Sequence, residues 1–396
     1  MTAPPSWPRV ALAMFAVGWG ANQFSPMLLA YRDELGTGTQ ERALLFALYA
    51  VGLIPALLVG GAASDRWGRR AVVVPFVALS PVATALLVVW HDWMPGLAVA
   101  RLLAGFCSGV VFGAASAWVA DLSEGGAPGA GARRAALSLS AGFALGPLAT
   151  GVVAQLAGSP LTVPYLPHVV LGTVALVLLL PVPGPRRADA PPRPLLRVPP
   201  VVRGRAFLLT VAPAAPWVFG CVAVAFAYLP SVVDGPSGLA LAFAGVLTGV
   251  TLGTGVAIQP VARRLDDRRP LLAGRVGLVA ALAGVLIGVA AVALDSLLLV
   301  LAAAPVLGAG YGCGLVSGLR EVERIAPADE RGAAVAVFYA LTYLGFFAPY
   351  LLGAAAGTGL GAAGALGLAA AFAVVSLAVV TLGGRQRPAQ AVVAAR

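Results

Sequence analysis

The chain has 396 residues, of which 60% are hydrophobic and only 11% are charged, and its 26 basic and 16 acidic side chains give a net charge of +10. Because soluble domains carry about 25% charged residues, this composition excludes an ordinary soluble domain and indicates a membrane protein. The positive charge does not indicate nucleic-acid binding, because the arginines are spread over short segments between apolar runs.

Apolar segments of membrane-spanning length recur along the whole chain. About 20 apolar residues in a helix cross a hydrocarbon core of ~30 Å. We expect an all-α membrane protein with twelve transmembrane helices in two pseudo-symmetric six-helix bundles. Residues 1–183 would form the N-terminal half, 184–205 a cytoplasmic linker loop, and 206–396 the C-terminal half with a short tail. The predicted spans are 9–30, 41–63, 71–90, 95–119, 135–156, 162–183, 206–231, 238–261, 271–293, 296–317, 332–353 and 361–382.

The first predicted span carries two polar side chains near its middle, Asn22 and Gln23. Polar groups in hydrocarbon need partners or water. We therefore interpret Asn22 and Gln23 as residues that line the substrate route. The same argument makes Tyr311, Tyr339 and Tyr343, in later spans, candidates for the substrate cavity.

A dense charged turn, Gly61-Ala-Ala-Ser-Asp65-Arg66-Trp-Gly68-Arg69-Arg70, separates the second span from the third. It resembles the signature loop between helices 2 and 3 of the major facilitator superfamily of secondary transporters. The resemblance implies that Asp65 lies near Gly332 in the outward-open state. The alternative is a set of loop arginines placed by the positive-inside rule, which leaves the aspartate unexplained. The residues expected to form a conformational latch are Gly61, Asp65, Arg66, Gly68, Arg69 and Arg70, with Asp121 paired to Arg69.

Arg101 lies within the fourth span and is followed by Gly105 and Gly109. A charge inside a span costs roughly 2.5–3.5 kcal/mol on insertion scales, so it marks a functional position by default. The pattern resembles the span-4 arginine motif that this family associates with proton coupling, although Ala104 stands where that motif often has glutamine. The alternative is an arginine that snorkels to the outer interface.

His168, in the sixth span, is the second candidate for proton coupling, because histidine titrates near neutral pH. The alternative is a histidine whose hydrogen bonds are satisfied between helices.

The fifth span contains Gly142-Phe-Ala-Leu-Gly146-Pro147-Leu-Ala-Thr150-Gly151. This resembles the antiporter motif of the same family, with Thr150 in place of one glycine, and the motif is associated there with export. The alternative is generic packing of small residues, which brings membrane helices close together. The residues expected to carry the motif are Gly142, Gly146, Pro147 and Gly151.

An internal repeat supports the division into halves. Three matches at corresponding positions predict a six-plus-six duplication, and the resemblance to the superfamily implies that substrate binds near the midplane between the repeats. The matches are 61–70 with 255–264 aligned without gaps, Gly105 and Gly109 with Gly308 and Gly312, and Ala127-Pro128 with Ala326-Pro327.

The placement of arginine orients the chain in the membrane. One set of inter-span loops holds most of the arginines, whereas the opposite set is mainly acidic. The positive-inside rule then places both termini and the linker in the cytoplasm. We expect a multi-pass plasma (inner) membrane protein, and the lysine-free composition, rich in Ala, Gly and Pro, indicates a bacterial source.

These patterns predict a secondary active transporter, most similar to the drug and metabolite:proton antiporters of the superfamily. We expect proton-coupled efflux of a small lipophilic or neutral compound by alternating access. The expected partners are the substrate, protons and the lipid bilayer, with no nucleic acid, and a monomer is expected. The alternatives are an importer or facilitator of a small nutrient or metabolite, and a non-transporting membrane sensor.

An enzyme is not expected. The sequence has no Gly-x-Ser-x-Gly elbow, phosphate-binding loop or ATP-binding domain. The three cysteines, Cys107, Cys221 and Cys313, lie singly within spans and have no metal-ligand spacing. No cofactor or metal is therefore predicted.

Overall fold

The computed structural model describes residues 6–123, 127, 130–184, 195–196, 198–327 and 330–385. Half of the predicted linker, 185–194 and 197, lies outside the described residues, as does Pro128 of the third repeat match. The regular structure of the described residues is helical throughout. Its elements are α1 (Trp7–Asn22), α2 (Phe24–Leu35), α3 (Thr39–Trp67), α4 (Arg69–Val89), α5 (Met94–Asp121), α6 (Ala130–Leu156), η1 (Val163–Tyr165), α7 (Leu166–Leu179), η2 (Pro200–Arg203), α8 (Arg205–Thr210), α9 (Ala215–Ala223), η3 (Val224–Tyr228), α10 (Leu229–Val232), α11 (Ala240–Ala257), α12 (Gln259–Arg268), α13 (Leu272–Ala293), α14 (Leu297–Ile325), α15 (Arg331–Tyr343), η4 (Leu344–Phe347), α16 (Ala348–Ala355), η5 (Ala356–Leu360) and α17 (Gly361–Arg385).

The helices account for the twelve predicted spans. In the described part of the chain, nine helical segments are long and apolar enough to cross a membrane. One of them, Arg331–Arg385, contains two predicted spans, separated by a turn in which Gly359 and Gly361 have φ of 95° and 65°. The shorter segment Val163–Leu179 corresponds to the sixth span, and α1 with α2 to the first. The twelve-span all-α fold class is confirmed.

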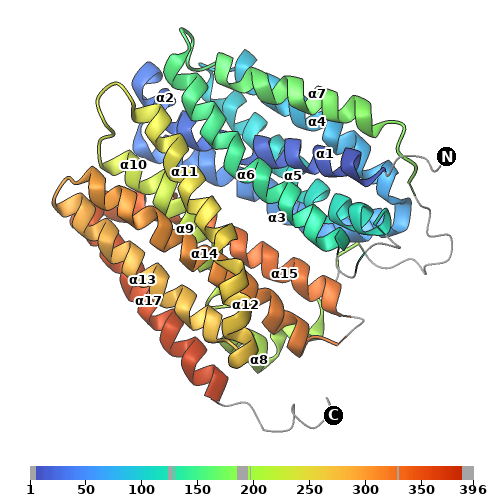
Figure 1. Cartoon of the computed structure of the whole chain (residues 1–396). Helices are drawn as coiled ribbons and strands as arrows, with labels where there is room; N and C mark the ends of the chain where they lie inside the picture. The colour runs from blue at the N-terminus through green and yellow to red at the C-terminus, as the bar shows by residue number, and fades with distance from the viewer. Residues whose placement is uncertain are drawn as a thin grey trace.

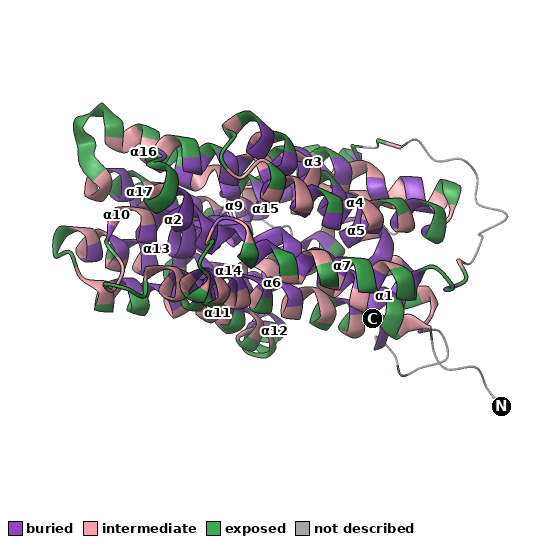
Figure 2. Cartoon of the chain, turned by 90° about the horizontal axis from the view of Figure 1, so that it is seen from above, coloured by how far each residue is buried: buried purple, intermediate pink, exposed green. Residues whose placement is uncertain are grey.

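The two halves lie side by side (Figure 1), with α1–α7 in one bundle and α8–α17 in the other. Figure 2 shows the buried residues on the helix faces that point into the protein and the exposed residues around the outside. Large apolar side chains remain exposed on that outer surface, among them Leu156, Leu298 and Val89. Such an apolar outer surface is suited to contact with lipid tails.

One helix–helix contact is repeated in the two halves. In the first half, a β-carbon built on Gly109 of α5 would overlap the Leu53 carbonyl oxygen of α3. In the second half, a β-carbon on Gly312 of α14 would overlap the Gly255 carbonyl oxygen of α11. Packing therefore relates α5 to α14 by an offset of 203 positions and α3 to α11 by an offset of 202. Close approach of the backbones requires glycine on α5 and α14.

This register differs from the ungapped alignment predicted from the sequence, which placed Gly61 on Gly255, an offset of 194. With the offset of 202 from the packing, Asp65 corresponds to Asp267. The acid that the ungapped alignment loses is therefore present in the second half, eight positions further along. The alignment matched a glycine and an arginine pair by residue type, whereas the helix contact makes Gly255 the equivalent of Leu53.

The contacts between the halves concentrate at one end of the bundle. We call it the arginine-poor end, because its turns carry acids such as Asp92 and Asp295, and we call the end that carries Arg69 and Arg320 the arginine-rich end. At the arginine-poor end, the side-chain Oε1 of Gln155 in α6 accepts a hydrogen bond from the Leu241 backbone N–H at 3.2 Å.

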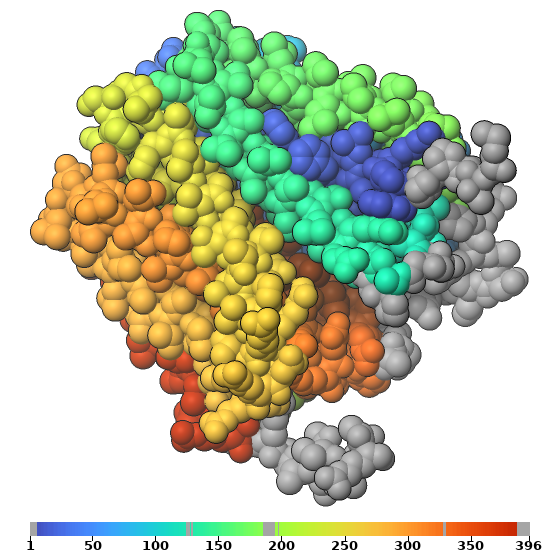
Figure 3. Space-filling view, in the orientation of Figure 1, coloured from blue at the N-terminus to red at the C-terminus, as the bar shows by residue number. Residues whose placement is uncertain are grey.

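At the arginine-rich end, the helices of the two halves diverge. A β-carbon on Gly253, further along α11, would meet no atom of the described residues within 4 Å. Figure 3 shows a hollow on this side, between α6 and α12, with α15 visible deeper between them. The halves are therefore packed together at the arginine-poor end and separated at the other.

Candidate functional site

A cluster of seven aromatic rings lies where the two halves meet. Rings from the two halves stack directly, because Phe46 and Phe346 have centroids 4.9 Å apart with planes at 17°. Within the second half, Phe219 stacks on Tyr343 at 4.4 Å and on Tyr311 at 5.6 Å. We call this the aromatic cluster, and its members are Phe46, Tyr49, Phe219, Phe226, Tyr311, Tyr343 and Phe346.

Two of the second-half rings lie at the middle of their spans. Phe219 is central in the segment Arg205–Val232, and Tyr311 is central in α14. The structure thus brings together two of the predicted cavity tyrosines, Tyr311 and Tyr343, while the third, Tyr339, is half-buried one turn before Tyr343 and has its ring 5.7 Å from Phe338. The phenylalanines were missed by the sequence analysis, because an apolar ring in an apolar span carries no polar signal.

Arg101 is buried inside the first half. Its guanidinium lies over the Phe24 ring, with Cζ 4.2 Å from the centroid, and over the Tyr49 ring at 4.9 Å. Its Nε donates to the Leu45 carbonyl oxygen at 3.2 Å, and its two terminal nitrogens have no partner in the described structure. The side chain is only 1% exposed, so the alternative that it snorkels to the interface is wrong.

Asn22 and Gln23 lie where α1 gives way to α2, and both are buried. The Gln23 side-chain Nε2 donates to the Thr84 hydroxyl at 3.0 Å, and that hydroxyl lies 2.8 Å from Nδ1 of His168. This chain of polar groups joins α1, α4 and α7. Nε2 of His168 faces α1, where a β-carbon built on Gly20 would lie 2.6 Å from it. Thr84 was not predicted, because its role depends on contacts across three helices.

The two proton-coupling candidates therefore occupy neighbouring polar clusters rather than one ion pair. Tyr165, three residues before His168, has its hydroxyl 3.0 Å from the hydroxyl of Tyr31. Gln23 precedes Phe24, whose ring carries the Arg101 guanidinium. The Arg101 cluster is buried between α2, α3 and α5, and the His168 cluster between α1, α4 and α7.

The predicted latch residues form a compact ion network at the arginine-rich end. Arg69 donates through Nη1 to Asp65 at 2.6 Å and to the Ser64 hydroxyl at 2.7 Å, and through Nε to Asp121 at 3.1 Å. Its side chain is 8% exposed. The network ties the end of α3 to the start of α4 and the end of α5.

The other latch residues take different positions. Arg66 is exposed and lies over the ring of Trp67 at 5.6 Å, and Gly68 has φ of 92°, a conformation that favours glycine. In this structure Asp65 pairs with Arg69. At Gly332, the position near which Asp65 is expected in the outward-open state, a β-carbon would meet no described atom within 4 Å.

A second ion network holds the arginine-rich end of the other half. Arg320 of α14 pairs with Asp267 of α12 at 2.6 Å. The buried Asp266 carboxylate accepts from the Ala273 backbone N–H at 2.8 Å, in the first turn of α13, where an acid is favourable. The sequence analysis missed this network because its alignment of the halves was shifted.

The antiporter-motif residues of α6 are divided between two contacts. β-Carbons on Gly142 and Gly146 would collide with the α1 backbone at Phe15 and Trp19. Gly151, one turn beyond Pro147, faces the other half, where a β-carbon would lie 2.6 Å from the Leu241 carbonyl oxygen. The motif thus packs α6 against both α1 and α11.

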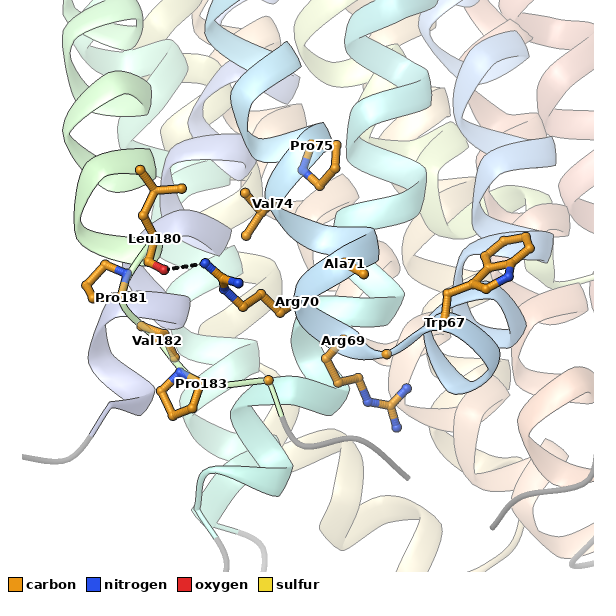
Figure 4. A pocket seen from close by; sticks show the side chains of 12 residues that line it. Trp67, Arg69, Arg70, Ala71, Val74, Pro75, Leu180, Pro181, Val182 and Pro183 are labelled. Carbon is orange, nitrogen blue, oxygen red and sulfur yellow. Dashed lines mark hydrogen bonds between the residues drawn. The ribbon is translucent and has the colours of Figure 1, made fainter. Parts of the chain in front are cut away.

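A cavity of about 680 Å³ opens at the arginine-rich end of the first half, away from the aromatic cluster (Figure 4). Its walls come from the start of α4 and from residues 180–184. Arg70 bridges them by donating to the Leu180 carbonyl oxygen at 2.7 Å. Because it lies at a helix end and not between the halves, we do not assign it to the transport route.

Among the described residues, no group of three or more His, Cys, Asp or Glu side chains is arranged to hold a metal ion. Cys107, Cys221 and Cys313 are buried singly.

The sequence matches the profile of the Major Facilitator Superfamily over residues 10–294. Since this is more than half of the chain, the protein belongs to that superfamily. It is a multi-pass membrane protein and a secondary transporter, not an enzyme. No curated protein matches the sequence.

Solved structures resemble the whole chain. A POT family transporter in complex with 5-aminolevulinic acid matches with a TM-score of 0.76 and 12% identity, covering 96% of this chain and 95% of that one. The nucleoside transporter NupG matches with 0.76 and 12%, covering 96% and 99%. A bacterial homologue of the lysosomal transporter spinster, inward-facing and occupied, matches with 0.75 and 15%, covering 98% of both chains. At these identities the likenesses establish the fold.

Proposed function

We propose that this transporter exports a small lipophilic or neutral compound in exchange for protons, by alternating access. The observation that supports it most directly is the position of the antiporter-motif helix. Gly151 of α6 lies against α11 where the two halves pack, so the motif occupies a contact that must change when the halves rock. Residues that resemble an export motif therefore lie at a moving interface.

The state of the structure agrees with this proposal. The halves are packed at the arginine-poor end and separated at the arginine-rich end. If the positive-inside rule holds, the arginine-rich end is cytoplasmic and this is an inward-facing state. The similar spinster homologue is described as inward-facing and occupied. We extend the proposal to a bacterial plasma membrane, with both termini in the cytoplasm and the protein working as a monomer.

The latch fits the same cycle. In the present state, Asp65 is held by Arg69, which Asp121 also holds. We propose that closure of the arginine-rich end brings Asp65 to the start of α15 near Gly332, where the helix dipole favours a negative charge. The network would then stabilise the outward-facing state.

For proton coupling we propose His168, with Arg101 as a fixed charge nearby. Arginine does not deprotonate in proteins, so Arg101 acts through its charge alone. His168 is buried and is linked through Thr84 to Gln23, next to the proposed substrate route. Protonation of His168 would add a charge to this apolar region and change the hydrogen bonds that hold α1 against α4.

The experiment is proton movement in inside-out vesicles that contain the protein and have an acid interior. Neutral antibiotics, lipophilic cations and sugars are added one at a time, and a pH-sensitive dye reports the interior. We expect a compound to release protons from wild-type vesicles but not from vesicles with Arg101→Ala or His168→Gln. If His168→Gln still exchanges a labelled substrate but releases no protons, His168 is needed for proton coupling and not for substrate binding.

A second candidate function is uncoupled import or facilitated diffusion of a small metabolite. It is favoured by one observation: in the described helices, the acidic side chains lie near helix ends, and none lies among the central rings. In the same vesicles, a labelled solute that equilibrates while no compound moves protons would establish this function and reject export by antiport.

A further inference from the structure

We propose that the aromatic cluster binds a substrate with a planar aromatic ring, and that Arg101 makes the site reject cationic forms of it. This inference rests on the proposed transport function and names its substrate class. It depends on three properties of the cluster, namely its position between the halves, the stacking of its rings and the charge beside it.

The rings belong to both halves. Phe46 and Tyr49 lie on α3, and their partner across the boundary is Phe346 of η4, at 4.9 and 5.8 Å. Phe46 also meets Phe226 edge-on at 6.2 Å. Alternating access moves the halves apart at the arginine-poor end, where they are packed together here, so these contacts must break in each cycle.

Separation leaves flat apolar faces without partners. Phe46 and Phe346 are each only 2% exposed here, and their planes differ by 17°, so each ring covers a face of the other. In the open state those faces would be hydrated, which is unfavourable for apolar surface. A planar aromatic ring restores stacking on both faces, whereas a saturated ring is thicker and has no π-face to stack. The Phe46–Phe346 pair thus marks the position and shape of the ligand.

The second half provides three further rings beside this position, two of which, Phe219 and Tyr343, also contact Phe346. Phe219 stacks on Tyr343 at 25° and on Tyr311 at 28°. The rings come from different segments, α9, α14 and α15, and are all buried. The three nearly parallel rings form an aromatic stack near the middle of the spans, where transporters of this fold bind substrate.

Aromatic faces by themselves attract cations. Here the charge next to the cluster is positive, because the Arg101 guanidinium lies on the Tyr49 ring, which in turn meets Phe346. In the described structure no carboxylate pairs with Arg101, and its terminal nitrogens are without hydrogen-bond partners. An uncompensated charge in a site of low dielectric acts strongly on its neighbours. A cationic ligand is therefore repelled, while a neutral or anionic aromatic is accepted.

The test is equilibrium binding to the purified full-length protein in lipid nanodiscs, with empty nanodiscs to subtract partition into lipid. Three probes with the same two-ring carbon skeleton are compared: naphthalenemethanol, its saturated counterpart decahydronaphthalenemethanol, and its cationic counterpart naphthylmethyltrimethylammonium. Fluorescence anisotropy follows naphthalenemethanol directly, and the other two are measured by competition. We expect the saturated and cationic probes to bind about tenfold more weakly than naphthalenemethanol.

Variants assign the effect to residues. Phe346→Leu and Phe46→Leu should each weaken naphthalenemethanol binding about tenfold and leave the saturated probe unchanged. The matched control is Phe372→Leu, because Phe372 also stacks on a ring, Trp217 at 5.4 Å, but is 49% exposed on the outer surface. Arg101→Gln should raise the affinity of the cationic probe towards that of the neutral one, and Arg101→Lys should keep the rejection.

Two results would overturn the inference: a saturated probe that binds as tightly as naphthalenemethanol, or a cationic probe that binds as tightly as the neutral one to wild-type protein. A melting curve for each variant separates loss of binding from loss of folding, and Arg101→Lys provides a folded comparison. If binding follows the expected order but no compound moves protons, antiport fails and the aromatic site stands. If a saturated compound drives proton release, the substrate class fails and antiport stands.

Discussion

Gly151 and Gly245 meet across the boundary between the two halves. A β-carbon built on Gly151 would lie 3.0 Å from the Cα of Gly245 and 2.6 Å from the carbonyl oxygen of Leu241. The opposing atoms belong to the backbone, which has no rotamer that relieves an overlap. Closure of the arginine-poor end therefore depends on glycine at position 151, because any side chain there would collide with the α11 backbone.

We predict that Gly151→Ala forces α6 and α11 apart and disfavours the state described here. Transport of a labelled substrate in vesicles should fall several-fold, and the melting temperature of the purified protein should drop. The control is Gly253→Ala, on α11 itself, because its β-carbon would meet no described atom within 4 Å. Equal transport by both variants would show that the close contact is not needed for the cycle.

We next predict that the repeated glycine contact stabilises both halves alike. Gly109→Ala would push a methyl group into the Leu53 carbonyl oxygen, and Gly312→Ala into that of Gly255. Overpacking of this kind typically costs about 1–3 kcal/mol. Both variants should therefore lower the melting temperature in detergent by similar amounts.

The control for this pair is Gly113→Ala on α5, since the nearest atom to its β-carbon would be 3.9 Å away. If only one of the two variants lowered the melting temperature, the two halves would not share this packing. That result would contradict the offset of 202–203 positions derived from the glycine contacts.

The sequence predicted the spans well because a helix in lipid must be apolar and about 20 residues long, which leaves a direct trace in composition. It identified Arg69 and Asp121 because charges beside apolar spans are conspicuous. It did not predict that Thr84 would join Gln23 to His168, since that contact depends on how three helices pack. Nor did it predict Phe46 against Phe346, because phenylalanine in a span has no distinguishing pattern.

The two ion networks at the arginine-rich end should differ in their energetic importance. The Arg69 and Asp121 side chains are 8% and 20% exposed, whereas those of Arg320 and Asp267 are 31% and 62% exposed. Charge-assisted bonds shielded from water contribute about 1.5–3 kcal/mol, but exposed pairs contribute about 0–1 kcal/mol. Asp121→Asn should thus lower the melting temperature clearly, and Asp267→Asn hardly at all. A larger loss for Asp267→Asn would contradict this order.

The last prediction concerns Thr84, whose hydroxyl links two buried side chains. In Thr84→Val the shape is retained but the hydroxyl is lost, so Gln23 Nε2 and His168 Nδ1 lose their shared partner. A buried polar group left without a partner costs about 1–3 kcal/mol. We expect a lower melting temperature and weaker proton release in inside-out vesicles, because His168 is no longer held against α4. Thr84→Ser should restore both.

The matched control is Thr248→Val in α11. Thr248 is fully buried like Thr84, but its hydroxyl donates to the Ala244 carbonyl oxygen of its own helix, which keeps its backbone hydrogen bond when the hydroxyl is lost. Its loss should cost less stability and leave proton release intact. If Thr84→Val released protons as wild type while its stability fell, the Gln23–Thr84–His168 chain would be a structural link, and the proton-coupling group would have to be sought elsewhere.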